Sequence, residues 1–173
     1  MKQLRTILAA VSLLMIFVSC SVPAPKEVEK PPLSFPEDDP VLQQPSEISL
    51  ERIHSGCTDC NDHSLTLRRA SGDKFAPAIV TNIDLHTKKQ RQGELSAYYY
   101  NKLLQLINSQ GFMEMNDEYA MNWADALIVR MSVSIGDKRK TIRTNNQGEV
   151  PPTLWGIYMA VDGAVAQTKW RDQ

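Results

Sequence analysis

The chain has 173 residues, and its 19 basic and 20 acidic side chains give a formal net charge of −1 at pH 7. This balance provides no overall attraction to a polyanion, so the composition argues against nucleic-acid binding. Hydrophobic residues make up 42% of the sequence, which is enough for the core of one domain with further segments outside it.

The first predicted element is an export signal in residues 1–19. A positively charged start precedes an uncharged, mostly apolar run from Ile7 to Val18, and Cys20 follows closely. The run is short of the roughly 20 apolar residues of a membrane span, although a transmembrane anchor and a plain cleavable signal remain alternatives. The arrangement resembles a bacterial lipoprotein signal. The resemblance implies that acyl chains such as palmitate on Cys20 hold the mature chain to the bilayer. Ser21, directly after this cysteine, resembles the sorting signal of lipoproteins that are held in the outer membrane and face the periplasm.

Residues 20–46 are predicted to form a tether. Seven of the ten prolines fall in this segment, together with more acidic than basic residues and few apolar ones. Such a composition cannot bury enough surface to offset the loss of chain entropy, so we expect disorder, with an arm docked on the domain as the alternative. A single folded domain is expected over residues 47–173.

Four strands are predicted in the first half of this domain. Alternation of apolar and polar residues, the period of a half-buried strand, runs through 48–53, 64–68 and 79–85. A shorter fourth strand is expected through 88–92. A polar loop over 55–62 separates the first two strands.

The second half is predicted to contain a helix, a hairpin and a second helix. The first helix follows Ser96 and ends at Gly111, and the last begins at Pro151-Pro152. Between them, strand 127–135 turns back into 140–144. Since strands and helices do not alternate as in parallel βαβ proteins, we expect an α+β fold, an antiparallel sheet with two helices packed on one face.

Two basic runs, 88–91 and 138–140, are interpreted as solvated loops or hairpin tips, with contact to an anionic lipid or glycan as the alternative. The acidic residues near 114–125, with Asp125 as a further candidate site residue, could suggest Ca²⁺. Their spacing does not fit an EF-hand loop, and a solvated loop is the preferred interpretation. No nucleophile elbow is present, and we expect no enzyme.

The cysteine pair Cys57 and Cys60 allows three interpretations. In an oxidising compartment the two thiols would join in a disulfide that shapes the loop, which is the preferred one. The C-x-x-C spacing also occurs in thiol oxidoreductases, but there it precedes a helix, whereas here a strand is expected. The third is a metal site, because His54, Cys57, Cys60 and His63 recur every three residues and offer ligands for Zn or Cu. Zinc sites usually join ligand pairs from separate segments, and no cofactor is expected otherwise.

The order of these features resembles an uncharacterised family of exported bacterial proteins and lipoproteins with a C-x3-C-P-x-Y turn. The matching positions are Gly56 to Leu67, Gly93 to Ser96, Gly111-Phe112, Tyr119, Asp125, Lys140 to Arg143, Pro152, Leu154 and Trp170. The cysteine loop is one residue shorter here, Asn61 replaces the proline, and His63 stands at the aromatic position. The family has no established activity, so the resemblance implies only the architecture.

The expected function is therefore a membrane-anchored lipoprotein with a periplasmic binding or structural module. Its partners would be the lipid bilayer, through Cys20, and an envelope protein or glycan. A metal-binding envelope protein using the His/Cys loop and a thiol–disulfide oxidoreductase are the alternatives.

Overall fold

The computed structural model describes residues 39–57, 60–121, 125–146 and 148–171. The predicted export signal, Cys20 and the predicted tether up to residue 38 lie outside the described residues. Among the residues that are described, no helix is both long and apolar enough to cross a membrane.

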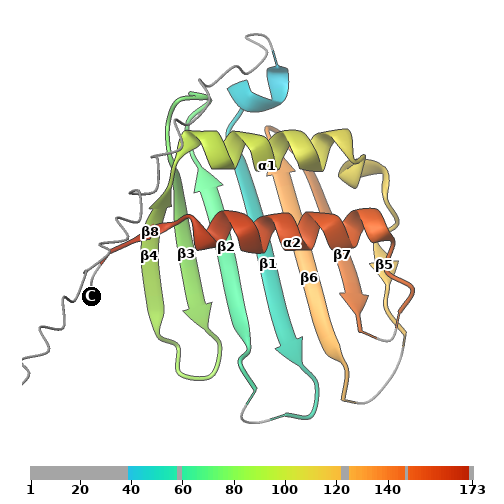
Figure 1. Ribbon diagram of the computed structural model, residues 1–173. Coiled ribbons are helices and arrows are strands. Elements are labelled where there is room, and N and C mark those ends of the chain that lie inside the picture. Colours follow the sequence, from blue (N-terminus) through green and yellow to red (C-terminus); the bar gives the residue numbers. More distant parts are fainter. Residues whose placement is uncertain (1–38, 58–59, 122–124, 147, 172–173) are drawn as a thin grey trace, which may run out of the picture. The chain divides into compact units, whose positions relative to one another are not determined.

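Eight strands form one sheet in the order β5-β7-β6-β1-β2-β3-β4-β8 (Figure 1). Their bounds are β1 Ser46–His54, β2 His63–Arg69, β3 Ala78–Asp84, β4 Gln90–Leu95, β5 Glu118–Tyr119, β6 Leu127–Ile135, β7 Lys138–Asn145 and β8 Lys169–Trp170. Neighbouring strands are antiparallel, except that β5 runs parallel to β7. The predicted α+β fold is confirmed, and the two residues of β5 add a short parallel edge to the otherwise antiparallel sheet.

Two helices, α1 (Ala97–Ser109) and α2 (Pro152–Ala166), lie across one face of the sheet (Figure 1). Each buries the apolar stripe that its sequence predicts, at positions three and four residues apart. The buried residues of these stripes are Tyr100, Leu103, Leu104 and Ile107 in α1, and Leu154, Ile157, Tyr158, Val161 and Ala164 in α2. Short 3₁₀ helices, η1 (Pro40–Gln43) and η2 (Phe112–Glu114), flank α1. Gly111 adopts the left-handed conformation, φ 66°, between α1 and η2.

The folded part begins earlier than the boundary predicted at residue 47. Leu42, in η1, is fully buried in the core, and its carbonyl accepts a hydrogen bond from the buried guanidinium of Arg69 at 2.8 Å. Asp39 starts η1 by accepting the N–H of Val41. Residues 39–46 therefore form an arm docked on the domain, which was the alternative to a disordered tether. The arm docks because Leu42 is buried in the core.

The helix-covered face changes from apolar to polar toward one end of β1, β2 and β3. Ile48 and Leu50 of β1 are fully buried, and the next position on the same face is Arg52. Cross-strand pairing places Arg52 beside His63 of β2, and His63 beside Asp84 of β3. The sequence thus ends its apolar core here and continues the same face with polar side chains.

Candidate functional site

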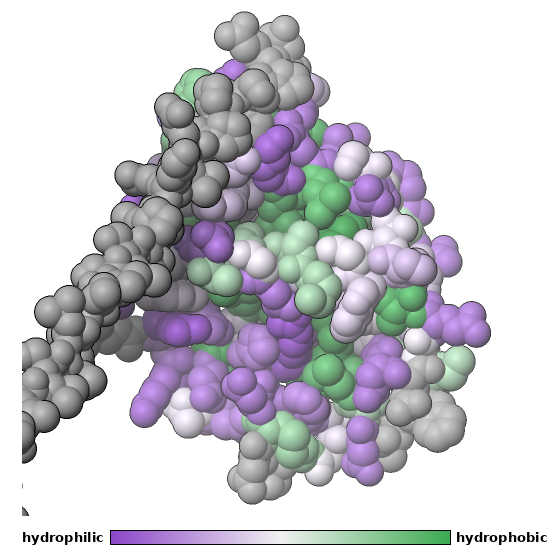
Figure 2. Space-filling view, viewed as in Figure 1, coloured by the Kyte–Doolittle hydropathy of each residue, from purple (hydrophilic) through white to green (hydrophobic). Residues whose placement is uncertain are grey.

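The polar end of the sheet is not covered by a helix. In Figure 1, α2 crosses the middle of the strands, and the β1–β2 loop and the β3–β4 hairpin extend below it. In Figure 2, mostly hydrophilic side chains gather over this region, below α2. This end carries most of the candidate residues that the sequence indicates, so it is the candidate functional site.

A disulfide closes the β1–β2 loop. Cys57 and Cys60 are bonded, with their Cα atoms 5.7 Å apart, as the preferred interpretation predicted. The loop is also tied to the start of β6, because the N–H of Ser55 donates to the carbonyl of Ala126 at 3.0 Å. Gly56 has a φ of 81°, and a Cβ atom there would lie 2.0 Å from Oδ1 of Asp125. Asp125 therefore packs over this loop, and a residue without a side chain is required opposite it.

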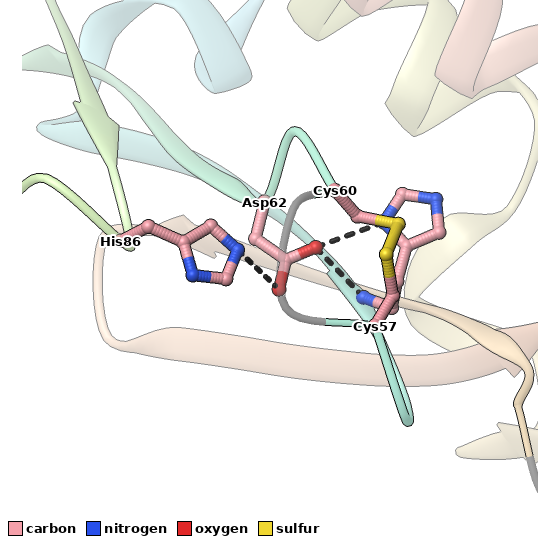
Figure 3. The surroundings of a disulfide bond; sticks show 5 residues. Cys57, Cys60, Asp62 and His86 are labelled. Atoms are coloured by element: carbon pink, nitrogen blue, oxygen red, sulfur yellow. Dashed lines mark hydrogen bonds and ion pairs between the residues drawn. A yellow bond between two sulfur atoms is a disulfide. The ribbon is translucent and has the colours of Figure 1, made fainter.

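Asp62 joins the loop to two other segments. Its side chain is 7% exposed, and its Oδ1 accepts the backbone N–H and the ring Nδ1–H of His54, both at 2.8 Å. On the other side, Nε2 of His86 lies 3.3 Å from Oδ2. Figure 3 shows Asp62 between His86 and the Cys57–Cys60 disulfide. One carboxylate thus fixes the end of β1, its own loop and the β3–β4 hairpin.

The surroundings of Asp62 favour its charged form. The backbone hydrogen bond from His54 holds the pKa of the Asp62 carboxyl below its usual value, and the ring hydrogen bond from the same residue adds to this. Burial acts in the opposite direction, and the nearby His86 lowers the pKa further. The carboxylate is therefore a negative anchor at neutral pH rather than a proton donor.

His63 faces a different set of partners. Nη1 of Arg52 donates to Nε2 of His63 at 3.3 Å, and Nδ1 of the same ring lies 3.1 Å from the carbonyl of Asn61. Since Arg52 can only donate and a carbonyl can only accept, we assign the proton of His63 to Nδ1. Arg52 also holds Asp162 of α2 through two hydrogen bonds of 2.9 and 2.8 Å. Both ring nitrogens of His63 are thus occupied within the protein.

A pocket of about 510 Å³ opens beside His63 and runs along the β3–β4 hairpin. Its lining combines amide, acidic and basic side chains with one apolar residue of α2: Asn61, His63, Asn82, Asp84, Lys89, Gln90, Arg91 and Val165. Arg91 lies 4.0 Å from the ring centre of Trp170 in β8, which fixes the cation at the rim. Oδ1 of Asn82 is buried and has no hydrogen-bond partner among the described residues.

The four predicted metal ligands do not converge. The two sulfurs are joined to each other, His54 donates to Asp62, and His63 is held by Arg52 and Asn61. Within the described ranges, no group of three or more His, Cys, Asp or Glu side chains is arranged to hold a metal ion. Two other acidic residues of the segment 114–125 form ion pairs with β7. Asp117 pairs with Lys140, and Glu118 pairs with Arg143.

Several residues of this end were not identified from the sequence as site residues. Asp62 lies in the predicted polar loop 55–62, His86 follows the third predicted strand, and Asn82 is one position of that strand. Arg91 was considered only as part of the basic run 88–91, with contact to an anionic lipid or glycan as the alternative. The alternation of β3 contains one usable signal, because a buried-face position there is occupied by an amide rather than an apolar residue. The pairing of Asp62 with His86 depends on strand register and has no local signal.

These elements define a two-layer α+β domain with a disulfide-closed polar end. Residues 81–165 match the model of a family described as a domain of unknown function, DUF6438. The predicted resemblance to an uncharacterised family is confirmed to this extent. The match runs from β3 into α2 and includes the hairpin side of the pocket, while the cysteine loop lies before it. No curated protein matches the chain.

Proposed function

We propose that this chain is a lipoprotein of the bacterial cell envelope whose domain binds an envelope glycan at the pocket beside the β3–β4 hairpin. The signal pattern of residues 1–19 and the position of Cys20 support a lipid anchor in the outer membrane, facing the periplasm. The Cys57–Cys60 disulfide fits such an oxidising compartment.

The single observation that carries the binding proposal is the pocket itself. It is lined by hydrogen-bonding side chains from two segments, and the ring contact between Arg91 and Trp170 fixes its rim. Asp62 holds the hairpin to the β1–β2 loop, so the pocket walls are positioned before a ligand arrives. A preorganised surface that combines hydrogen-bonding groups with apolar area suits a hydroxylated ligand.

We propose binding rather than catalysis, because the reactive groups nearby are held in contacts within the protein. His63 uses both ring nitrogens, and Asp62 is kept charged between two histidines. The oxidoreductase and metal alternatives have less support: the disulfide lies in a strand-to-strand loop rather than before a helix, and His54 and His63 have separate partners.

Retention on isolated bacterial cell walls tests this proposal. We expect the purified, unlipidated Cys20→Ser protein to sediment with cell walls, and a Lys89→Gln/Arg91→Gln double variant to remain in solution. The matched control is Lys138→Gln/Arg139→Gln, which removes the same charges from the exposed start of β7. Equal sedimentation of the pocket variant, or none by the parent protein, would contradict the proposal.

A further inference from the structure

The pocket beside the β3–β4 hairpin has an excess of positive charge. Lys89 and Arg91 are exposed on its rim, and Asp84 is the acidic residue of its lining. Oδ1 of Asp84 already accepts the N–H groups of His86 and Thr87, at 2.9 and 2.8 Å, which close the hairpin turn. The two cations therefore have only one carboxylate in the lining to oppose them, and that carboxylate is engaged in the turn.

Arg91 remains able to donate hydrogen bonds to a ligand. Its guanidinium lies over the face of Trp170, and stacking of this kind occupies the flat side of the group while the N–H groups point outward in its plane. A planar fork of donors recognises carboxylate and phosphate oxygens well. Lys89, two residues earlier on the same hairpin, adds a second positive charge to the same rim.

Asn82 supplies an independent indication. Buried polar atoms are nearly always hydrogen-bonded. Oδ1 of Asn82 is buried and has no partner within the described part of the chain, and Asn82 is one of the residues that line the pocket. This oxygen can only accept a hydrogen bond. A ligand that fits therefore brings a hydroxyl or amide N–H to Asn82.

Resting on the proposed function, we propose that the pocket takes an anionic sugar. Its acid group binds Lys89 and Arg91, and a hydroxyl or amide N–H of the sugar donates to Oδ1 of Asn82. The negative charge can come from a carboxylate or from a phosphate, since both suit the same cations.

Calorimetry with three sugars tests the ligand class. The probes are N-acetylmuramic acid, which carries a carboxylate, glucose 6-phosphate, and neutral N-acetylglucosamine. We expect at least one acidic sugar to bind the unlipidated Cys20→Ser protein at least about tenfold more tightly than the neutral sugar. This difference in affinity is what one charge-assisted hydrogen bond contributes. Arg91→Gln and Lys89→Gln should each lower that affinity about tenfold, and Lys138→Gln should leave it unchanged. The preferred acidic sugar identifies the source of the charge.

The Asn82→Leu variant gives a second test, because its stability and its sugar affinity should change in opposite directions. Removing a buried acceptor without a partner should raise the midpoint of thermal unfolding, while the lost contact should weaken sugar binding. Unchanged affinity in this variant, or equal binding of the neutral sugar, would overturn the assignment. If none of the three sugars binds while the parent protein still sediments with cell walls, the ligand class is wrong and the proposed function stands. If sedimentation fails as well, both are wrong.

Discussion

At the scale of single residues, Asp62 has the largest structural role in the polar end. It is an almost buried carboxylate that accepts three hydrogen bonds or ion pairs from His54 and His86. No apolar residue could replace these contacts, because the backbone N–H of His54 and two ring nitrogens would lose their acceptor.

Asp62 should therefore contribute to acid sensitivity. Because its pKa is lowered in the folded protein by the hydrogen bonds from His54, the folded state holds this proton less tightly than the unfolded chain. The stabilisation is complete above the ordinary pKa of 3.8 and is lost as the pH falls through the lowered value. We expect Asp62→Asn to unfold at a lower temperature than the parent at pH 7, and the gap to close below pH 3.8.

Thermal unfolding from pH 7 down to acid conditions measures this difference, with Asp84→Asn as a comparison. Asp84 also has a lowered pKa, through the N–H of Thr87, but it closes only its own hairpin turn. A gap for Asp62→Asn that stays constant with pH would show that the carboxylate charge is not the source of its stabilising effect.

At the scale of elements, α2 shows how one helix divides into two faces. Leu154 is fully buried, whereas the next residue, Trp155, is 60% exposed. We expect Leu154→Ala to lower the free energy of unfolding by about 2–5 kcal/mol, since it leaves a cavity in the core. Trp155→Ala should change it by less than about 0.5 kcal/mol. Denaturant unfolding of the two variants measures both values, and similar losses would mean that the helix is rotated relative to this description.

The β1–β2 loop permits a similar test of the disulfide. Closing so short a loop should stabilise the fold by about 2 kcal/mol in the chain-entropy model. We expect the Cys57→Ser/Cys60→Ser variant to lose about this much free energy of unfolding and to keep its sugar affinity, because neither cysteine lines the pocket. Loss of binding with unchanged stability would favour the thiol chemistry that we consider less supported.

The elements with a long, uninterrupted pattern are the ones that the sequence predicts well. Strand β6 matches its predicted bounds, because nine residues alternate without a break. Strands β5 and β8 have two residues each, too few to show any period, and were not predicted. Strand β4 begins later than expected, since hydrogen bonds to Asp84 extend the preceding turn.

The site was predictable only where its signal is local. The bond between Cys57 and Cys60 could be predicted because both lie in one short loop and an oxidising compartment favours a disulfide. His86 meets Asp62 only after β2 and β3 pair in one register, and Arg91 meets Trp170 only when the end of the chain adds a strand to β4. Such contacts join segments far apart in the sequence, so a single sequence does not reveal them. The burial of Leu42 was not predicted because the local signal was misleading, since the prolines around it indicated a tether.

At the scale of the whole molecule, the proposal joins a lipid anchor to a binding domain. Residues 1–38 contain the predicted export signal and Cys20, and the described residues begin at residue 39. Labelling with palmitate tests the proposed anchor separately from the binding domain. We expect radioactive palmitate to label the parent chain in a bacterial host and not to label Cys20→Ser, with the parent in the membrane fraction. Equal labelling of both, or labelling of neither, would contradict the anchor.

The central claim is that the pocket beside the β3–β4 hairpin is where a ligand binds. The most direct measurement is an amide NMR titration of the unlipidated Cys20→Ser protein with N-acetylmuramic acid, glucose 6-phosphate and N-acetylglucosamine. The account predicts that one of the acidic sugars causes its largest shifts at Asn82, Lys89 and Arg91, and that the neutral sugar causes smaller ones. Shifts centred instead on the open face of the sheet or on the outer face of α2 would contradict it.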